Sequence, residues 1–256
     1  MSYKLFECVR KGNSDRQLII FPYLGGSVST LSELMRAVDS PETEIWAANP
    51  PGHIGSQLPL SHDMNQLTDL YYTELKEIVK PECYLFGHSM GGNIAYYMAK
   101  KWEKFGLKRD WLKGVVIAAS APPCFMYHKK YSELSDSALI DQIMAYKALP
   151  VDVIKSEELM QMLLPVFRAD YRVMETGAEI EIGEKLAVDS YFIWGDEDPV
   201  EPVELLTKWN QYFAQPGTVL PVKHAEHMLV HHNIDAVAGY LRNILNGKYR
   251  KKAEEF

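Results

Sequence analysis

Ser89 is the residue of this sequence whose surroundings most clearly predict chemistry. It lies at the centre of G-H-S-M-G, residues 87–91, which has the spacing of a nucleophile elbow, G-x-S-x-G. Apolar residues 84–86 before it predict a strand, and small residues after it predict a helix. In such a turn the serine is held in a strained backbone conformation, and glycines flank it to avoid a clash. The pattern predicts a nucleophilic hydroxyl, although a glycine-rich turn with a surface serine would have the same residues.

A serine nucleophile needs a base, and the base needs an acid that orients it. In proteins with a nucleophile elbow the acid and then the histidine follow the serine along the chain. The loop 195–199, G-D-E-D-P, follows an apolar run and carries three acids. We predict Asp198 as the acid because Pro199 stiffens the chain directly after it, and Asp196 is the alternative.

The base is expected in the later loop 223–229, K-H-A-E-H-M-L. We predict His227 because it lies deepest in this loop, just before an apolar run, and His224 is the alternative. His88 is next to the serine, but its side chain should point away from the hydroxyl. A metal site is not expected, because there is no H-E-x-x-H segment and no cysteine pair.

A second glycine-rich loop, P-Y-L-G-G-S at residues 22–27, follows the apolar run 17–21. Such a loop can cradle phosphate, but the G-x-x-x-x-G-K-[ST] pattern is missing. Beside a nucleophile elbow, we expect this loop to supply one backbone N–H of an oxyanion hole. The other N–H would come from Met90, the residue after the serine.

The order of elements predicts an α/β fold with a mostly parallel sheet covered by helices on both faces. Strands are expected near residues 4–9, 17–21, 44–48, 84–86, 114–119, 190–194 and 218–222. Helices are expected at 29–38, 63–78, 203–213 and 234–245, besides the one after the serine. Residues 121–188 contain no clear strand but three helical segments, 135–148, 156–164 and 165–176. We expect one domain over 1–256, with residues 121–188 inserted as a helical lid.

The composition limits the classes of partner. The chain has 256 residues, a net charge of -7 and a pI near 5.6, which argues against nucleic acid or anionic membrane as partners. The three cysteines Cys8, Cys83 and Cys124 are expected to be reduced thiols. No signal-peptide pattern begins the chain and no apolar stretch is long enough to span a membrane, so a cytoplasmic location is expected.

Taken together, these motifs resemble the stand-alone type II thioesterases of nonribosomal peptide and polyketide assembly lines. The resemblance runs over most of the chain. It rests on F-P-Y-L-G-G-S at 21–27, P-P-G-H at 50–53, F-G-H-S-M-G-G at 86–92, R-A-D at 168–170, residues 195–199 and His227-Met228. Two segments depart from the family pattern: the loop 223–226 lacks glycines, and His53 replaces a common arginine.

The resemblance implies an α/β-hydrolase fold with a helical lid and hydrolysis of acyl or aminoacyl thioesters from the phosphopantetheine arm of carrier proteins. It implies Ser89 as nucleophile, Asp198 as acid, His227 as base, and the N–H groups of Leu24 and Met90 as the oxyanion hole. No cofactor is implied, the carrier-protein contact would be transient, and the enzyme would be a monomer.

Three alternative functions use the same residues differently. A medium-chain fatty acyl thioesterase and a small-ester esterase or lipase would both use the same triad. A non-catalytic carrier-binding module would not need a complete set of serine, histidine and acid, and this set argues against it.

Overall fold

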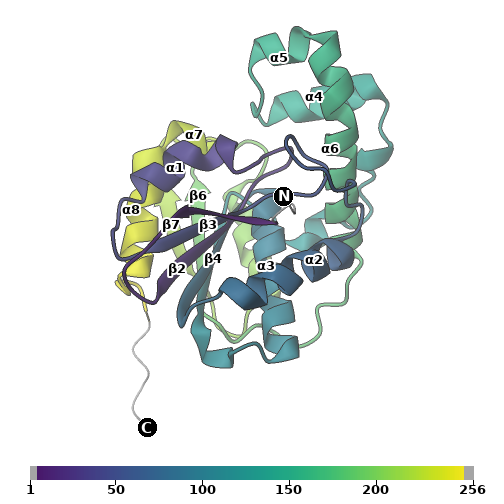
Figure 1. Ribbon diagram of the computed structural model, residues 1–256. Helices are drawn as coiled ribbons and strands as arrows, with labels where there is room; N and C mark the ends of the chain where they lie inside the picture. The colour runs from purple at the N-terminus through teal and green to yellow at the C-terminus, as the bar shows by residue number, and fades with distance from the viewer. Residues whose placement is uncertain (1–4, 251–256) are drawn as a thin grey trace.

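A seven-stranded sheet lies between two layers of helices in the computed structural model, which describes residues 5–250 apart from the side chain of Arg109 (Figure 1). The strand order is β1-β3-β2-β4-β5-β6-β7, and only the β1–β3 pair is antiparallel. This arrangement confirms the predicted mostly parallel sheet. The strands are β1 (Phe6–Arg10), β2 (Arg16–Phe21), β3 (Glu44–Ala48), β4 (Glu82–His88), β5 (Leu112–Ala118), β6 (Ser190–Gly195) and β7 (Thr218–Val222).

Helices cover both faces of the sheet, with α1 and α8 on one face and α2 and α3 on the other (Figure 1). The α-helices are α1 (Ser32–Ala37), α2 (Met64–Ile78), α3 (Met90–Phe105), α4 (Asp136–Ala145), α5 (Val151–Lys155), α6 (Glu157–Ala178), α7 (Leu229–His232) and α8 (Ile234–Leu245). The 3-10 helices are η1 (Ser29–Leu31), η2 (Arg109–Trp111), η3 (Pro123–Met126), η4 (Tyr131–Glu133) and η5 (Val203–Gln211).

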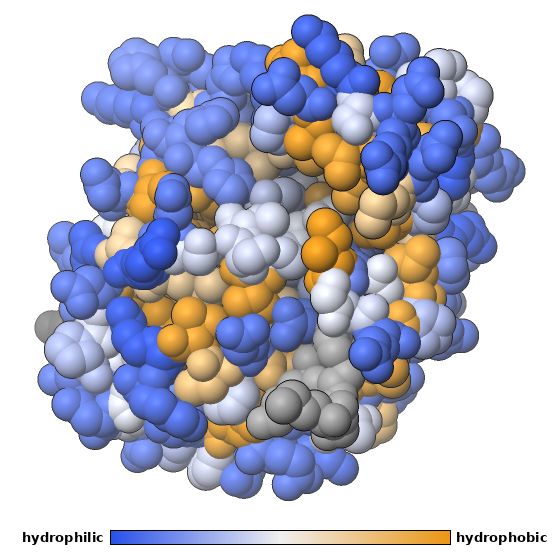
Figure 2. All heavy atoms as spheres, turned by 45° about the horizontal axis from the view of Figure 1, so that its top comes forward, coloured by the Kyte–Doolittle hydropathy of each residue, from blue (hydrophilic) through white to orange (hydrophobic). Residues whose placement is uncertain are grey.

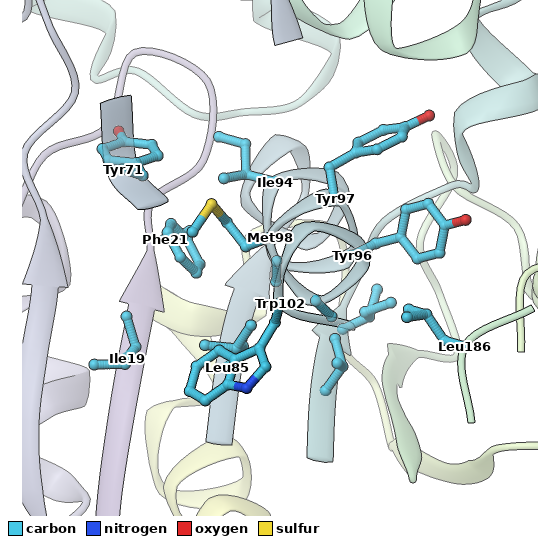
Figure 3. Packing of buried hydrophobic residues seen from close by; sticks show 14 of the residues in the cluster. Ile19, Phe21, Tyr71, Leu85, Ile94, Tyr96, Tyr97, Met98, Trp102 and Leu186 are labelled. Carbon is cyan, nitrogen blue, oxygen red and sulfur yellow. The ribbon is translucent and has the colours of Figure 1, made fainter. Parts of the chain in front are cut away.

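The central strands are apolar on both sides because each side faces its own core. In β2, Ile19 and Phe21 belong to the core under α2 and α3, while Leu18 and Ile20 belong to the core under α1 and α8. Figure 3 shows the first of these cores, in which Trp102 of α3 lies close to Leu85 of β4. Successive side chains of a strand point to opposite faces, so this sequence requires helices on both.

Residues 121–188 are mostly helical, as expected. The helices η3, α4 and α6 share a core of their own, and Figure 1 shows α4 and α5 standing clear of the sheet. The prediction of separate helices at 156–164 and 165–176 is wrong, because α6 continues through Pro165. Pro165 is exposed, so the carbonyl of Gln161 that loses its hydrogen bond can bind water. Buried Leu164 and Phe167 on either side pack into the same cluster and hold the helix together.

The segment expected as a helix at 203–213 is the 3-10 helix η5, Val203–Gln211. Leu206, Trp209 and Tyr212 are buried and follow one another at intervals of three residues. Three residues per turn bring such positions onto one face of a 3-10 helix, whereas they drift apart on an α-helix. The burial of this face explains the tighter winding.

Gly91 lies where the start of α3 meets the end of β2, and a matched pair of substitutions tests this contact. A Cβ at Gly91 would lie 2.1 Å from the carbonyl oxygen of Phe21, whereas the nearest atom to a Cβ at Gly239 in α8 is 3.8 Å away. Gly91→Ala is expected to lower the free energy of unfolding by about 1–3 kcal/mol through overpacking. Gly239→Ala should raise it by about 0.5–1 kcal/mol. Urea unfolding followed by circular dichroism measures both, and equal effects would contradict the close contact.

Candidate active site

Ser89 occupies the turn between β4 and α3, with φ 52° and ψ -122°. Positive φ is strained for a residue with a side chain, and it is typical of a residue that is held for function. The Ser89 N–H donates to the carbonyl of Ala118 at 2.9 Å, which fixes the turn against β5. A Cβ at Gly87 would lie 1.9 Å from the carbonyl oxygen of Gly91, so the turn can close only with glycine there.

Ser89, His227 and Asp198 form one chain of hydrogen bonds. His227 Nε2 lies 3.0 Å from Ser89 Oγ, and His227 Nδ1 lies 2.9 Å from Asp198 Oδ2. The carboxylate can only accept, so Nδ1 carries the proton and Nε2 is the acceptor for the serine hydroxyl. The side chains of Asp198 and His227 are 0% and 3% exposed. This arrangement lets the imidazole take the serine proton while the carboxylate holds its orientation.

Asp198 is held in place by the loop after β6. Its Oδ1 accepts from the backbone N–H groups of Val200 and Glu201, both at 2.9 Å. Its Oδ2 is then left for His227. A carboxylate whose oxygens both receive hydrogen bonds keeps one rotamer, so the loop presents a fixed acceptor to the imidazole.

The two alternatives from the sequence lie outside this chain of hydrogen bonds. Asp196 is exposed, and its backbone N–H bonds to Val222. His224 is exposed as well and pairs through Nδ1 with Glu197 Oε1 at 2.8 Å. The hydrogen bond and charge of Glu197 raise the pKa of His224, which is typical of a surface ion pair.

His88 is fully buried behind His227, a contact that the sequence did not reveal. Its Nε2–H donates to the backbone carbonyl of His227 at 2.8 Å, so the ring points away from the hydroxyl of the neighbouring Ser89. Burial, followed by the charge of His227, lowers the pKa of His88 well below its usual value. His88 is therefore neutral and acts as a fixed donor to the histidine loop.

The loop at residues 22–27 is anchored on both sides of Leu24. Tyr23 Oη bonds to His231 Nε2 at 2.8 Å, and the N–H of Gly25 donates to Asp170 Oδ2 at 2.7 Å. Leu24 and Met90 both line the same cleft as Ser89. Met90 is the first residue of α3, where the backbone N–H has no partner within the helix.

Asp170 also bonds to His53, and this pair was not predicted from the sequence. His53 Nε2 lies 3.1 Å from Asp170 Oδ2, and its Nδ1 lies 3.2 Å from the carbonyl oxygen of Pro51. Burial lowers the pKa of His53, but the charge and hydrogen bond of Asp170 outweigh it, and the pKa is raised. Both ring nitrogens face acceptors, so the protonated ring fits best. His53 stands at the position where the resemblance leads one to expect an arginine, and it bonds to the carboxylate of Asp170.

The cleft over Ser89 is mainly apolar and is walled by residues of the segment 121–188. The Tyr146 ring packs against the His227 ring at a tilt of 60° and a centroid distance of 4.8 Å, and Lys147 pairs with Glu226 at 2.6 Å. These contacts tie the segment to the histidine loop. The lining residues are Tyr23, Leu24, Ser89, Met90, Asn93, Ser120, Ala121, Phe125, Met126, Ile143, Tyr146, Ala148, Tyr171, Met174, Glu201, His227 and Met228.

Within residues 5–250, no group of three or more histidine, cysteine or acidic side chains is arranged to hold a metal ion. In the same part of the chain, no helix has the length and apolar character needed to cross a membrane.

A profile of the Thioesterase domain family matches residues 16–245, a range that contains Ser89, Asp198 and His227. The chain belongs to the thioesterase family. The family assignment confirms the resemblance drawn from the motifs.

Individual relatives of this thioesterase agree with the family. A probable cadicidin biosynthesis thioesterase of Streptomyces griseus is 26% identical over 222 residues, covering 86% of this chain and 60% of the relative, so the alignment spans less than two thirds of that protein. Thioesterase TesA of Mycobacterium leprae is 25% identical over 78% of this chain and 77% of its own.

Solved structures of thioesterases share the fold. The type II thioesterase BorB from the borrelidin biosynthetic cluster superposes with a TM-score of 0.79 at 26% identity, covering 94% of this chain and 97% of BorB. ClbQ from the colibactin pathway superposes with a TM-score of 0.80 at 24% identity, covering 92% and 98%, which supports the fold alone. The predicted α/β-hydrolase fold of this thioesterase is confirmed.

The pair of His53 and Asp170 predicts a pH dependence of stability. The pKa of His53 is higher in the folded thioesterase than the ordinary value of about 6.5 in the unfolded chain. The stabilisation is therefore complete below about pH 6.5 and is lost as pH rises through the folded pKa. Asp170→Asn should remove this slope and cost about 1.5–3 kcal/mol of unfolding free energy at pH 6.

Urea unfolding of both proteins between pH 5.5 and pH 8.5 measures the difference. Glu197→Gln is the matched control, because it removes the carboxylate of an exposed histidine pair, which solvent screens, and should change the slope much less than Asp170→Asn does. The same slope in the wild type and in Asp170→Asn would show that His53 is not charged in the folded state.

Proposed function

We propose that this thioesterase hydrolyses acyl or aminoacyl thioesters from the phosphopantetheine arm of carrier proteins in nonribosomal peptide or polyketide synthesis. The chain of hydrogen bonds from Ser89 through His227 to Asp198 carries the proposal. We assign Ser89 as nucleophile, His227 as general base and Asp198 as the acid that orients it. We assign no cofactor to the reaction, and the substrate arrives on the phosphopantetheine arm of a partner protein.

In the first half of the reaction, Ser89 Oγ attacks the thioester carbonyl and His227 Nε2 takes the hydroxyl proton. The carbonyl carbon becomes tetrahedral, and its oxygen gains a negative charge. The backbone N–H groups of Leu24 and Met90 are our candidates for stabilising this charge, and the positive end of α3 adds to the effect. Imidazolium on His227 is stabilised by the carboxylate of Asp198.

The intermediate then collapses. The bond between carbon and sulfur breaks, His227 returns its proton to the pantetheine sulfur, and an acyl ester remains on Ser89. Water enters, gives a proton to His227 and attacks the ester carbonyl. The second intermediate releases Ser89 as the hydroxyl and the acyl group as a free acid.

Carrier proteins as partners are supported by the biosynthetic pathways of related thioesterases and by the surface of the segment 121–188. The relatives include thioesterases of the cadicidin and borrelidin pathways. Large apolar side chains of α4, α5 and α6 are exposed, namely Met144, Val151, Leu159 and Met162. Figure 2 shows hydrophobic patches between polar ones on the face that carries the top of Figure 1. We infer that residues 121–188 act as a lid of a single domain and contact the carrier.

The acidic balance of the enzyme bears on how tightly a carrier binds. The net charge of -7 repels an acidic carrier at long range, so docking depends on apolar contacts and is weak and transient. Transient docking suits a monomer that edits many carriers in the cytoplasm.

Mass spectrometry of a panel of acyl-loaded carrier proteins, before and after incubation with the enzyme, tests the proposal. Loss of the acyl group from the carriers is the expected result. Faster hydrolysis of small oxygen esters than of carrier thioesters would indicate an esterase or lipase. Activity restricted to medium-chain fatty acyl carriers would indicate a fatty acyl thioesterase, and no turnover with retained carrier binding would indicate a binding module.

Ser89→Ala removes the proposed nucleophile and leaves the fold unchanged. We expect kcat to fall by about 10⁴–10⁶-fold and labelling by a fluorophosphonate probe to disappear. Thermal unfolding of the variant at the wild-type temperature serves as the control for folding. Activity within tenfold of the wild type would rule out the serine mechanism.

The choice between the two histidines is tested by a pair of variants. His227→Ala should lose about 10³-fold or more in kcat, because the hydroxyl loses its proton acceptor. His224→Ala should keep kcat within twofold, because His224 is exposed and pairs only with a surface acid. Steady-state kinetics on one acyl thioester measures both, and the reverse result would move the base to His224.

A further inference from the structure

Glu201 is a buried acid in the cleft that the mechanism above does not use. It lies three residues after Asp198, is 6% exposed, and lines the same cleft as Ser89 and His227. Its backbone N–H donates to Asp198 Oδ1 at 2.9 Å, which fixes where its side chain begins. Burying an acid costs free energy unless the group is paired, so the position of this side chain needs an explanation.

The carboxyl group of Glu201 is incompletely bonded. The backbone N–H of Ala121 bonds to it, but Oε2 is buried and has no hydrogen-bond partner among the described residues. Burial and then the charge of Asp198 raise the pKa of Glu201 to about 8. A group that is both buried and short of a partner is a site where a ligand donor can bind.

The walls around this carboxyl have the character of a site for a cation. No lysine or arginine lines the cleft, so Glu201 has no positive side chain to pair with there. Four phenyl or phenol rings line the same cleft, those of Tyr23, Phe125, Tyr146 and Tyr171. A carboxylate among aromatic faces is the combination that binds ammonium groups, through an ion pair and through cation–π contacts.

We propose that Glu201 is a specificity-determining residue that binds an ammonium group on the acyl chain, so that this enzyme prefers aminoacyl thioesters to neutral acyl thioesters of the same shape. An acyl chain that carries a carboxylate is disfavoured, because its charge would be buried in a cleft that no lysine or arginine lines. This inference rests on the proposed function and names its substrate class.

Proton balance is simple at neutral pH. An aminoacyl thioester that enters as the free amine takes the proton of Glu201, and one that enters as ammonium displaces that proton to water. In both cases the bound state is a carboxylate facing an ammonium. The ion pair then lies in the same cleft as Ser89, and its ammonium belongs to the thioester that Ser89 attacks.

Alanyl and isobutyryl thioesters of pantetheine test the proposal, because they differ only by an ammonium in place of a methyl group. We expect kcat/KM, corrected for spontaneous hydrolysis, to be about tenfold or more higher for the alanyl thioester, which corresponds to about 1.4 kcal/mol. A malonyl thioester should be the poorest of the three. Equal values for alanyl and isobutyryl would overturn the proposal.

Glu201→Gln keeps the shape of the side chain and removes its charge. The ratio of alanyl to isobutyryl kcat/KM should fall to about one, and the malonyl thioester should improve. Glu204→Gln, which changes an exposed acid of η5, is the matched control and should keep the wild-type ratio. A fall of both rates by one factor in Glu201→Gln would assign Glu201 to support of Asp198 and overturn the proposal. If the variant does not fold, the wild-type ratio decides alone.

Binding to Ser89→Ala gives a readout that does not depend on hydrolysis. Calorimetry with alanyl and isobutyryl pantetheine amides should show about tenfold tighter binding of the amine, and no preference in the Ser89→Ala, Glu201→Gln double variant. Equal affinities in Ser89→Ala would overturn the role of Glu201. If no thioester is hydrolysed by the wild type while the amine still binds more tightly, the proposed function fails and the ammonium site remains.

Discussion

The close contact between the start of α3 and the end of β2 is the constraint on which the site depends. A Cβ at Gly91 would lie 2.1 Å from the carbonyl oxygen of Phe21, so the helix begins directly against the strand. Ser89, two residues earlier, must then turn sharply, and its φ of 52° is the consequence. The same contact brings the loop after β2 beside the first turn of α3. One backbone approach thus sets the positions of the hydroxyl, of Leu24 and of Met90.

The histidine loop is held to the sheet by backbone contacts of a similar kind. A Cβ at Gly195 would lie 2.2 Å from the carbonyl oxygen of Ala225, and the N–H of Glu197 donates to the same oxygen at 3.1 Å. The loop that carries Asp198 and the loop that carries His227 are therefore packed together through their backbones, independently of the contact between the two side chains. His88 adds its hydrogen bond to the carbonyl of His227 from the strand that ends at the serine. The spacing of the three side chains follows from this backbone packing, which limits how far any one can drift.

The strands, most of the helices and the turn at Ser89 could be predicted from the sequence, because each of them has a local residue pattern. The cap of α2 is an example: Asp63 accepts from the N–H of Gln66 at 2.9 Å, as its capping-box spacing predicts. Contacts between distant segments leave no such pattern. Asp170 bonds to Gly25 and His53, which lie 145 and 117 residues away. The continuous helix through Pro165 also depends on tertiary packing, which outweighs the local cost of proline.

Two neighbours, Asp198 and His88, set the charges around the His227 imidazole. His227 bonds to Asp198 on one side and has neutral His88 behind it. The ring centroids of His88 and His227 are 5.3 Å apart. Were His88 able to take a proton, its charge would oppose the imidazolium that the proposed mechanism forms on His227. Burial prevents this, since a fully buried ring resists protonation. The His88 imidazole can therefore lie in contact with His227 and hold the histidine loop without competing for the proton that the proposed mechanism transfers from Ser89 to His227.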